Sequence, residues 1–105
     1  MEILFKTSKM KKNCEDHKQL SRLYGPQQAN QIIKRINEFL SAENLFDILK
    51  LPQARLHPLS GNLQGAFAVD LRHPKRIILI PLNGETNDLK TITKVEITDV
   101  CIDYH

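Results

Sequence analysis

The stretch PQQANQIIKRINEFLS, residues 26–41, has the clearest periodicity in the chain. Its apolar side chains recur at intervals of three and four residues, the spacing of one face of an α-helix. We therefore predict an amphipathic helix whose apolar face packs on the protein core and which ends near Ser41. The apolar positions are Ala29, Ile32, Ile33, Ile36, Phe39 and Leu40, and the opposite, polar positions are Gln28, Gln31, Lys34, Arg35 and Glu38.

A second helix is expected before this one, from Met10 to Tyr24, because apolar positions there also follow helical spacing. Ser8 is placed to cap its amino end. Gly25 stops this helix, and Pro26 suits the first position of the next one. A joint this short predicts a helical hairpin.

Most of the remaining chain favours β-structure, apart from a short helix over residues 43–49. Within residues 65–72, Phe67, Val69 and Leu71 alternate with smaller or polar residues, as in a half-buried strand. Short turns join the later strands, so antiparallel pairing is expected. The extended segments are residues 1–6, 55–59, 65–72, 76–81 and 94–104.

This order of elements predicts an α+β fold formed by residues 1–105 as a single domain. The N-terminal strand and the helical hairpin should pack on one face of a twisted, mainly antiparallel sheet. The predicted core consists of Leu20, Ile32, Ile33, Ile36, Phe39, Val69, Ile78, Ile80 and Ile97.

Composition excludes several classes of protein. No apolar run approaches the roughly 18 residues of a membrane span, and residues 1–5 are too short for a signal-peptide core. We therefore expect a cytoplasmic protein without membrane association. Cys14 and Cys101 are far apart and are expected to be small buried apolar residues, and His17 is expected to be structural. Neither metal-ligand spacing nor a glycine-rich phosphate loop occurs, so no cofactor is predicted.

Positive charge is concentrated in the middle of the chain. Residues 50–76 contain five basic residues and one acidic residue, Asp70, whereas residues 77–105 contain two basic and five acidic residues. His57 and His73 lie within the basic block. Such a block favours a polyanionic partner.

Several short motifs of the second half resemble the RelE/ParE/HigB toxin superfamily of bacterial toxin–antitoxin pairs. The resemblance is strongest to its HigB-like branch, whose members are also called killer-suppression or plasmid-maintenance killer proteins. The residues that carry the resemblance are Leu51-Pro52-Gln53-Ala54-Arg55, His57, Leu59, Gly61-Asn62, Gly65, Val69-Asp70-Leu71, His73-Pro74, Arg76 and Ile102-Asp103-Tyr104-His105.

The resemblance implies a RelE-like fold and an RNA-cleaving site. It assigns catalytic roles to Tyr104, His105 and Arg76, with His57 as a further candidate. The basic block supplies the expected RNA-binding residues, which are Arg72, Lys75, His73 and Arg55. If the strand that Arg76 opens pairs antiparallel with the last strand, Arg76 lies beside the end of that strand.

These residue types suit metal-independent cleavage, because RNA carries its own nucleophile, the 2′-hydroxyl group. Histidine can donate or accept a proton near neutral pH, arginine stays charged and presents a planar fork to phosphate oxygens, and tyrosine offers a hydroxyl or an aromatic face. A carboxylate at the end of the chain would raise the pKa of His105, which favours the role of general acid.

The implied partners are a cognate antitoxin, expected to be of the helix-turn-helix type, and mRNA on the ribosome, with DNA contacted only through the antitoxin complex. Two alternatives share the fold: a ParE-like inhibitor of DNA gyrase and a catalytically degenerate member that only binds a protein. His105 argues against the first, since ParE-like members generally lack it. Leu63 and Gln64 stand where relatives carry a basic residue, which keeps the second open.

Overall fold

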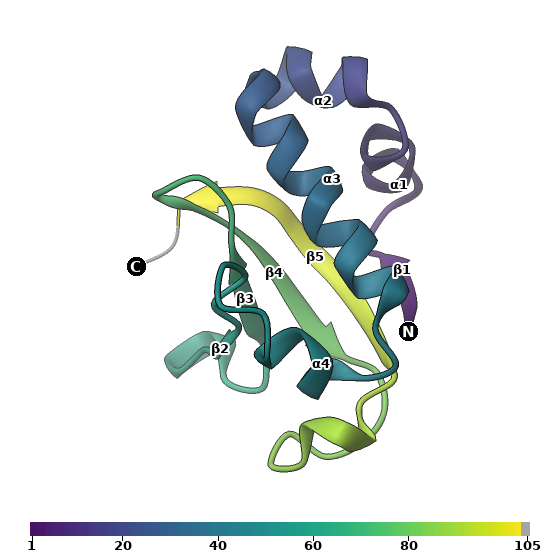
Figure 1. The fold of residues 1–105 in the computed structure, drawn as a ribbon, viewed down its shortest axis with the longest axis vertical. Helices are drawn as coiled ribbons and strands as arrows, with labels where there is room; N and C mark the ends of the chain where they lie inside the picture. Colours follow the sequence, from purple (N-terminus) through teal and green to yellow (C-terminus); the bar gives the residue numbers. More distant parts are fainter. Residues whose placement is uncertain (104–105) are drawn as a thin grey trace.

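The computed structural model describes residues 1–103. Tyr104 and His105, two of the predicted catalytic residues, lie outside the described residues. Helices fill most of the first half of the chain, and every strand of the described residues except β1 lies in the second half (Figure 1). The elements are β1 (Glu2–Phe5), α1 (Ser8–Cys14), α2 (His17–Tyr24), α3 (Pro26–Ser41), α4 (Leu45–Leu49), β2 (His57–Pro58), η1 (Gly61–Leu63), β3 (Phe67–Asp70), β4 (Lys75–Pro81), η2 (Leu89–Thr91) and β5 (Lys94–Asp103).

The strands form one sheet of order β1-β5-β4-β3-β2. β1 runs parallel to β5, and the other three pairings are antiparallel. The expected mainly antiparallel sheet is confirmed. The parallel pair is possible because a long stretch of chain separates β1 from β5, and a parallel connection needs a long crossover.

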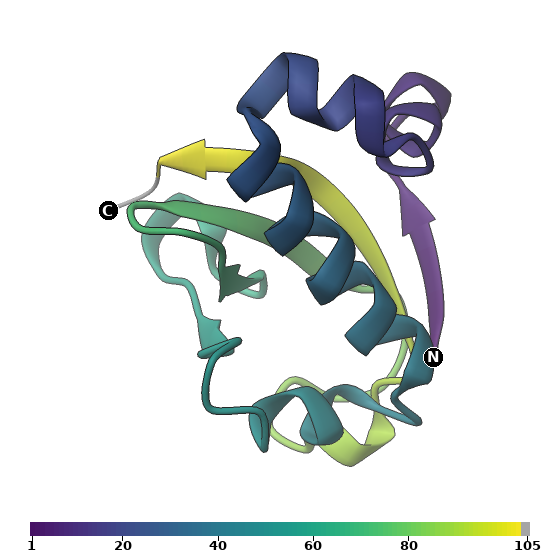
Figure 2. The same ribbon diagram turned by 45° about the horizontal axis from the view of Figure 1, so that its top comes forward.

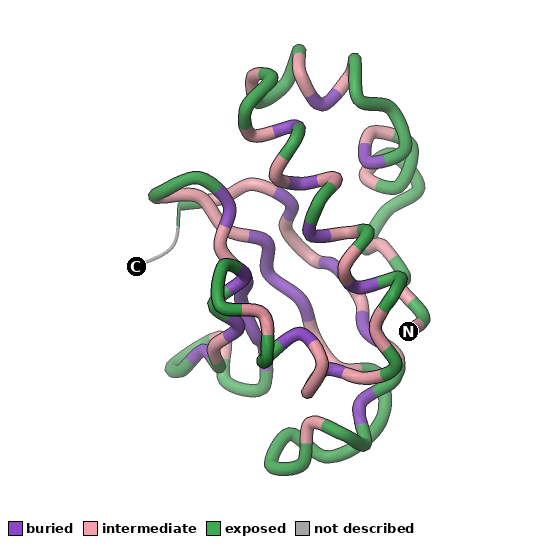
Figure 3. The backbone as a smooth tube through the Cα atoms, viewed as in Figure 1, coloured by how far each residue is buried: buried purple, intermediate pink, exposed green. Residues whose placement is uncertain are grey.

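Helix α3 lies across one face of the sheet in two views that differ by 45° (Figures 1 and 2). The main core fills this interface and includes Ile32 and Phe39 from α3 and Val69, Leu79 and Ile97 from the strands. Buried positions follow the inner strands and the inner side of α3 (Figure 3). The expectation of helices packed on one face of a sheet is therefore confirmed.

The helix expected from Met10 to Tyr24 is two helices. α1 ends at Cys14, and Asp16 caps α2 by accepting from the backbone N–H groups of Lys18 and Gln19. An aspartate in the extended conformation is a strong helix start, and this capping overrides the apolar periodicity. Thr7 caps α1, in place of the expected Ser8.

The joint between α2 and α3 is as predicted. Gly25 has a φ of 88°, a conformation that other residues rarely adopt, and Pro26 occupies the first turn of α3. The short helix expected over residues 43–49 is shorter, because the Asn44 side chain caps α4 by accepting from the backbone N–H of Asp47.

Two positions of α3 are reversed relative to the prediction. Arg35, expected on the polar face, is 3% exposed, whereas Leu40, expected on the apolar face, is 58% exposed. Arg35 is buried because the described fold offers it three acceptors: the Asp70 carbonyl at 2.8 Å, the Gln53 carbonyl at 2.9 Å and the Glu38 carboxylate at 3.0 Å. A charged group is buried only when it is paired in this way.

The predicted core is largely confirmed. Ile33, Ile36 and Ile80 are only half-buried, and the other predicted positions are buried, namely Leu20, Ile32, Phe39, Val69, Ile78 and Ile97. Cys14 is buried as expected and Cys101 is half-buried, and burial raises the pKa of the Cys14 thiol to about 11.

The sheet face opposite α3 carries a second, smaller apolar cluster, formed by Leu59, Ala66, Ala68 and Ile78. The segment that connects β2 to β3 supplies Leu59 and Ala66, so this segment folds back over its own sheet. Both faces of β3 are consequently buried, where the alternation of residues 65–72 predicted one. Short Ala66 and Ala68 side chains permit this close approach.

Within residues 1–103, no helix is long and apolar enough to cross a membrane. The same residues bring no three His, Cys, Asp or Glu side chains into an arrangement that could hold a metal ion.

Phe39 and its neighbour Leu40 provide a test of the packing. Phe39→Ala should lower the free energy of unfolding by about 3–5 kcal/mol, because it leaves a cavity under α3. Leu40→Ala should change it by less than about 0.5 kcal/mol, because Leu40 is a surface residue. Urea titrations followed by circular dichroism measure both, and equal losses would show that the face of α3 is assigned wrongly.

Candidate functional site

The candidate site lies where β3 turns into β4. Asp70, the last residue of β3, pairs across the strands with Arg76, and Arg76 in turn pairs with Ile102 near the end of β5. The expected juxtaposition of Arg76 with the end of the last strand is thus confirmed. Residues directly opposite each other share a face, and Ala68 and Ile78 identify this face as the one opposite α3.

The carboxylate of Asp70 joins two arginines. Its Oδ1 lies 3.2 Å from Nε of Arg76, and its Oδ2 lies 3.4 Å from Nη1 of Arg55. The Asp70 and Arg76 side chains are each about one-fifth exposed, whereas Arg55 is 68% exposed. Asp70 therefore fixes Arg76 in a partly desolvated position, where an ion pair is stronger than at the open surface.

Arg55 is held in an unusual backbone conformation. Its φ of 47° makes it the one non-glycine residue with positive φ among residues 1–103. The neighbouring Ala54 carbonyl accepts from the Asp70 N–H at 2.7 Å, so the segment is anchored beside the end of β3. Strained backbone of this kind persists where the surroundings enforce it, often at functional positions.

His57 lies on the same face as Asp70, because it pairs with Ala68, two residues earlier in β3. Its Nδ1 is 2.7 Å from the backbone carbonyl of Arg55. A carbonyl oxygen only accepts, so Nδ1 carries the hydrogen and, in the neutral ring, Nε2 carries the lone pair. The arrangement therefore presents a proton acceptor on the face that carries Arg76.

The remaining predicted RNA-binding residues lie elsewhere on the same turn. Arg72 is directed toward the start of α3: the Gln28 side chain bonds its backbone N–H and carbonyl, at 3.1 Å and 2.9 Å, and Gln27 accepts from its guanidinium. His73 is exposed, and Lys75 is half-buried opposite Asp103. The predicted set thus divides into a group around Asp70, a pair at the joint between α2 and α3 formed by Arg72 and His73, and Lys75 at the start of β4.

Sequence reasoning missed Asp70 and Arg35 as organising residues. Arg35 reaches the site from the helix side, since it binds the carbonyls of Asp70 and Gln53. Asp70 could have been found as the single acidic residue in the basic block, residues 50–76. Arg35 carried no such signal, because it falls among the polar positions of the helix that the spacing predicts.

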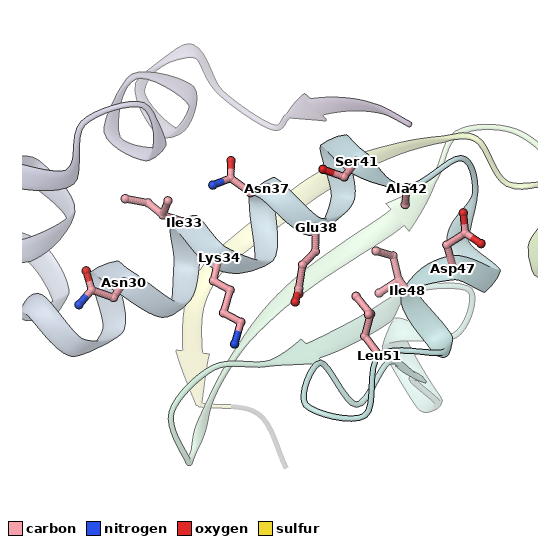
Figure 4. A pocket seen from close by; sticks show the side chains of 10 residues that line it. All are labelled: Asn30, Ile33, Lys34, Asn37, Glu38, Ser41, Ala42, Asp47, Ile48 and Leu51. Atoms are coloured by element: carbon pink, nitrogen blue, oxygen red, sulfur yellow. The ribbon is translucent and has the colours of Figure 1, made fainter.

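A hollow of about 710 Å³ lies between α3 and α4 (Figure 4). Ile33, Ile48 and Leu51 form its apolar part, and Lys34 and Glu38 lie among its polar residues. It contains none of the residues predicted to be functional, so we place the candidate site at the turn between β3 and β4.

No protein-family model matches the chain, and no curated protein matches it. Solved structures do share its fold. A structure described as a YoeB/ParE toxin from Agrobacterium tumefaciens gives a TM-score of 0.52 at 16% identity, over all of both chains. A YoeB-YefM complex from Staphylococcus aureus gives a TM-score of 0.50 at 20% identity, over all of this chain and 97% of the other. The expected toxin-type fold is confirmed, while the HigB-like branch and the site residues stay predictions.

The ion pair between Asp70 and Arg76 can be measured with a double-mutant cycle. Asp70→Asn and Arg76→Gln should be coupled by about 1 kcal/mol in unfolding free energy, because the pair is partly desolvated. The exposed pair of Glu2 and Lys94, 3.9 Å apart, serves as the control and should show a smaller coupling. Equal couplings would mean that Asp70 does not hold Arg76 in place.

Proposed function

We propose that this protein is the toxin of a type II toxin–antitoxin pair, of the HigB-like branch, and that it cleaves mRNA on the ribosome. The observation that carries the proposal is the position of Arg76. Asp70 holds it on the face that also presents His57, beside the end of β5. The shared fold and the basic block of residues 50–76 support the proposal.

The reaction that these residues suit is transfer of the RNA phosphate to its own 2′-hydroxyl. The 2′-oxygen attacks phosphorus as its proton passes to a base, and the bond from phosphorus to the 5′-oxygen breaks. An acid then protonates the leaving 5′-oxygen, so the products are a 2′,3′-cyclic phosphate and a 5′-hydroxyl. The protein has to supply the base, the acid and a cation for the charge on the phosphate.

In this proposal, Arg76 is the cation. Its Nε–H is engaged by Asp70, which fixes the plane of the guanidinium. A planar fork that is held in place loses little conformational freedom when it binds phosphate oxygens. His57 is the proposed base, which accepts the 2′-hydroxyl proton through Nε2, and the bond of Nδ1 to the Arg55 carbonyl supports this role.

His105 is proposed as the general acid and Tyr104 as an accessory hydroxyl or stacking ring. Both assignments rest on the resemblance of residues 102–105 to the toxin superfamily and on the end of β5 at Asp103. Arg55, Arg72, His73 and Lys75 complete the RNA-binding surface of the proposal.

The proposed partner is a cognate antitoxin of the helix-turn-helix type, with DNA contacted only through that complex, and the proposed location is the cytoplasm. One of the structures that share this fold is described as a complex of YoeB with YefM. Growth arrest on expression of the chain alone, relieved by expression of the adjacent gene, tests this partner.

Of the two alternatives, a ParE-like gyrase inhibitor and a degenerate member that only binds a protein, one feature favours the second. Leu63 packs against the second apolar cluster and Gln64 is uncharged, so neither offers the basic group that relatives carry there. Expression of the chain separates these hypotheses. Loss of mRNA integrity supports the nuclease, and altered plasmid supercoiling supports gyrase inhibition. If neither change is seen, the result supports a member that only binds a protein.

Arg76→Ala should lower the rate of mRNA cleavage in a translation extract by about 100- to 1000-fold, the cost of losing one charge-stabilising donor. Arg76→Lys should restore only part of the rate, because the ammonium group lacks the fork. Arg22→Ala, an exposed arginine on α2, is the matched control and should cleave at the parental rate. Full activity of Arg76→Ala would place the anion site elsewhere.

His105→Gln should abolish cleavage while antitoxin binding is retained, because the substitution removes the proposed proton donor but keeps a polar side chain. Cleavage products resolved on gels, together with copurification of the antitoxin, measure both properties. Parental cleavage by this variant would contradict the acid assignment and would leave His57 as the histidine to test next.

A further inference from the structure

A separate hollow of about 320 Å³ lies where the joint between α2 and α3 meets the turn between β3 and β4. Tyr24 and the two glutamines that open α3 line one side, and Arg72 and His73 line the other. A hollow of this size is at the lower end of the range for small-ligand sites. It combines an aromatic ring with two basic side chains.

Tyr24 is unusual among the aromatic residues of the described chain. It is 38% exposed, whereas the phenylalanines are buried or half-buried. It also lines a second hollow, between α1, α2 and β5, together with Cys14 and Cys101. An aromatic ring with exposed surface is the feature on which single-stranded nucleic acids stack their bases.

Arg72 is held in place by the two glutamines at the start of α3. The Gln28 side chain bonds both backbone polar groups of Arg72, and Gln27 accepts from the guanidinium. These contacts hold an exposed cation beside the hollow. They also engage the side-chain amide of Gln28 and the Gln27 oxygen, which leaves little capacity to read the edge of a base.

We propose that this hollow binds the RNA nucleotide next to the cleaved bond, with its base stacked on Tyr24 and its phosphate at Arg72 and His73. This subsite rests on the proposed function, since it extends the same RNA strand past Arg76. Stacking without contacts to the base edge tolerates any base, so the subsite contributes affinity and register without selecting a sequence.

The turn between β3 and β4 connects the proposed cleavage site at Arg76 with the hollow beside Tyr24. The Leu71 N–H donates to the Lys75 carbonyl at 3.0 Å and the Lys75 N–H donates to the Arg72 carbonyl at 2.9 Å, so the turn is tight. Arg76 faces away from α3, and Arg72 contacts the start of α3. The strand of RNA would therefore round the end of the sheet at this turn.

The test uses the full chain in a translation extract that contains end-labelled mRNA, with cleavage followed as a function of protein concentration. Tyr24→Leu keeps an apolar side chain but removes the ring, and it should raise the half-saturating concentration about tenfold, within the range for loss of one stacked base. Tyr24→Phe keeps the ring and should behave like the parental chain. Leu23→Ala, the exposed neighbour outside the hollow, is the control.

The outcomes are distinct. If the parental chain cleaves mRNA and Tyr24→Leu saturates at the parental concentration, the subsite is wrong and the proposed function stands. If the parental chain cleaves no mRNA, both proposals are overturned. If Tyr24→Leu does not fold by circular dichroism, Arg72→Gln replaces it and is judged by the same shift, because Arg72 is exposed and carries little packing.

Discussion

The buried guanidinium of Arg35 ties together the two layers of this protein. From α3 it donates to the carbonyls of Asp70 and Gln53 and to the carboxylate of Glu38. Removing a charged donor from such a position leaves buried acceptors without partners, which costs more than the net value of the bonds themselves. The segment before β2, the end of β3 and the middle of α3 are therefore held in one arrangement by one side chain.

The candidate site depends on this arrangement through Asp70. The Asp70 carbonyl faces Arg35 and α3, while its side chain projects to the opposite face and binds Arg76 and Arg55. The Asp70 N–H is bound in turn by the Ala54 carbonyl, next to the strained Arg55. One residue at the end of a strand thus couples the core side of the sheet to the exposed basic side.

The second apolar cluster gives this basic face a firm support. Leu59 and Ala66 fold back over Ala68 and Ile78, so the sheet beneath His57 and Arg76 is packed on both sides. Side chains that have to keep a fixed geometry at a site need such a support. The group at Arg72 and Tyr24, by contrast, relies on side-chain contacts to the start of α3.

The order of the elements and the pairing of Arg76 with the end of β5 could be predicted from the sequence, because periodicity and short turns are local properties. The joint at Gly25 and Pro26 was predictable for the same reason. The environment of Arg35 and Leu40 was not, because helical spacing defines a face only approximately and does not show what packs against it. Whether an arginine at the border of that face is buried depends on acceptors 18 and 35 residues away, and only the folded chain brings these carbonyls within reach of its guanidinium.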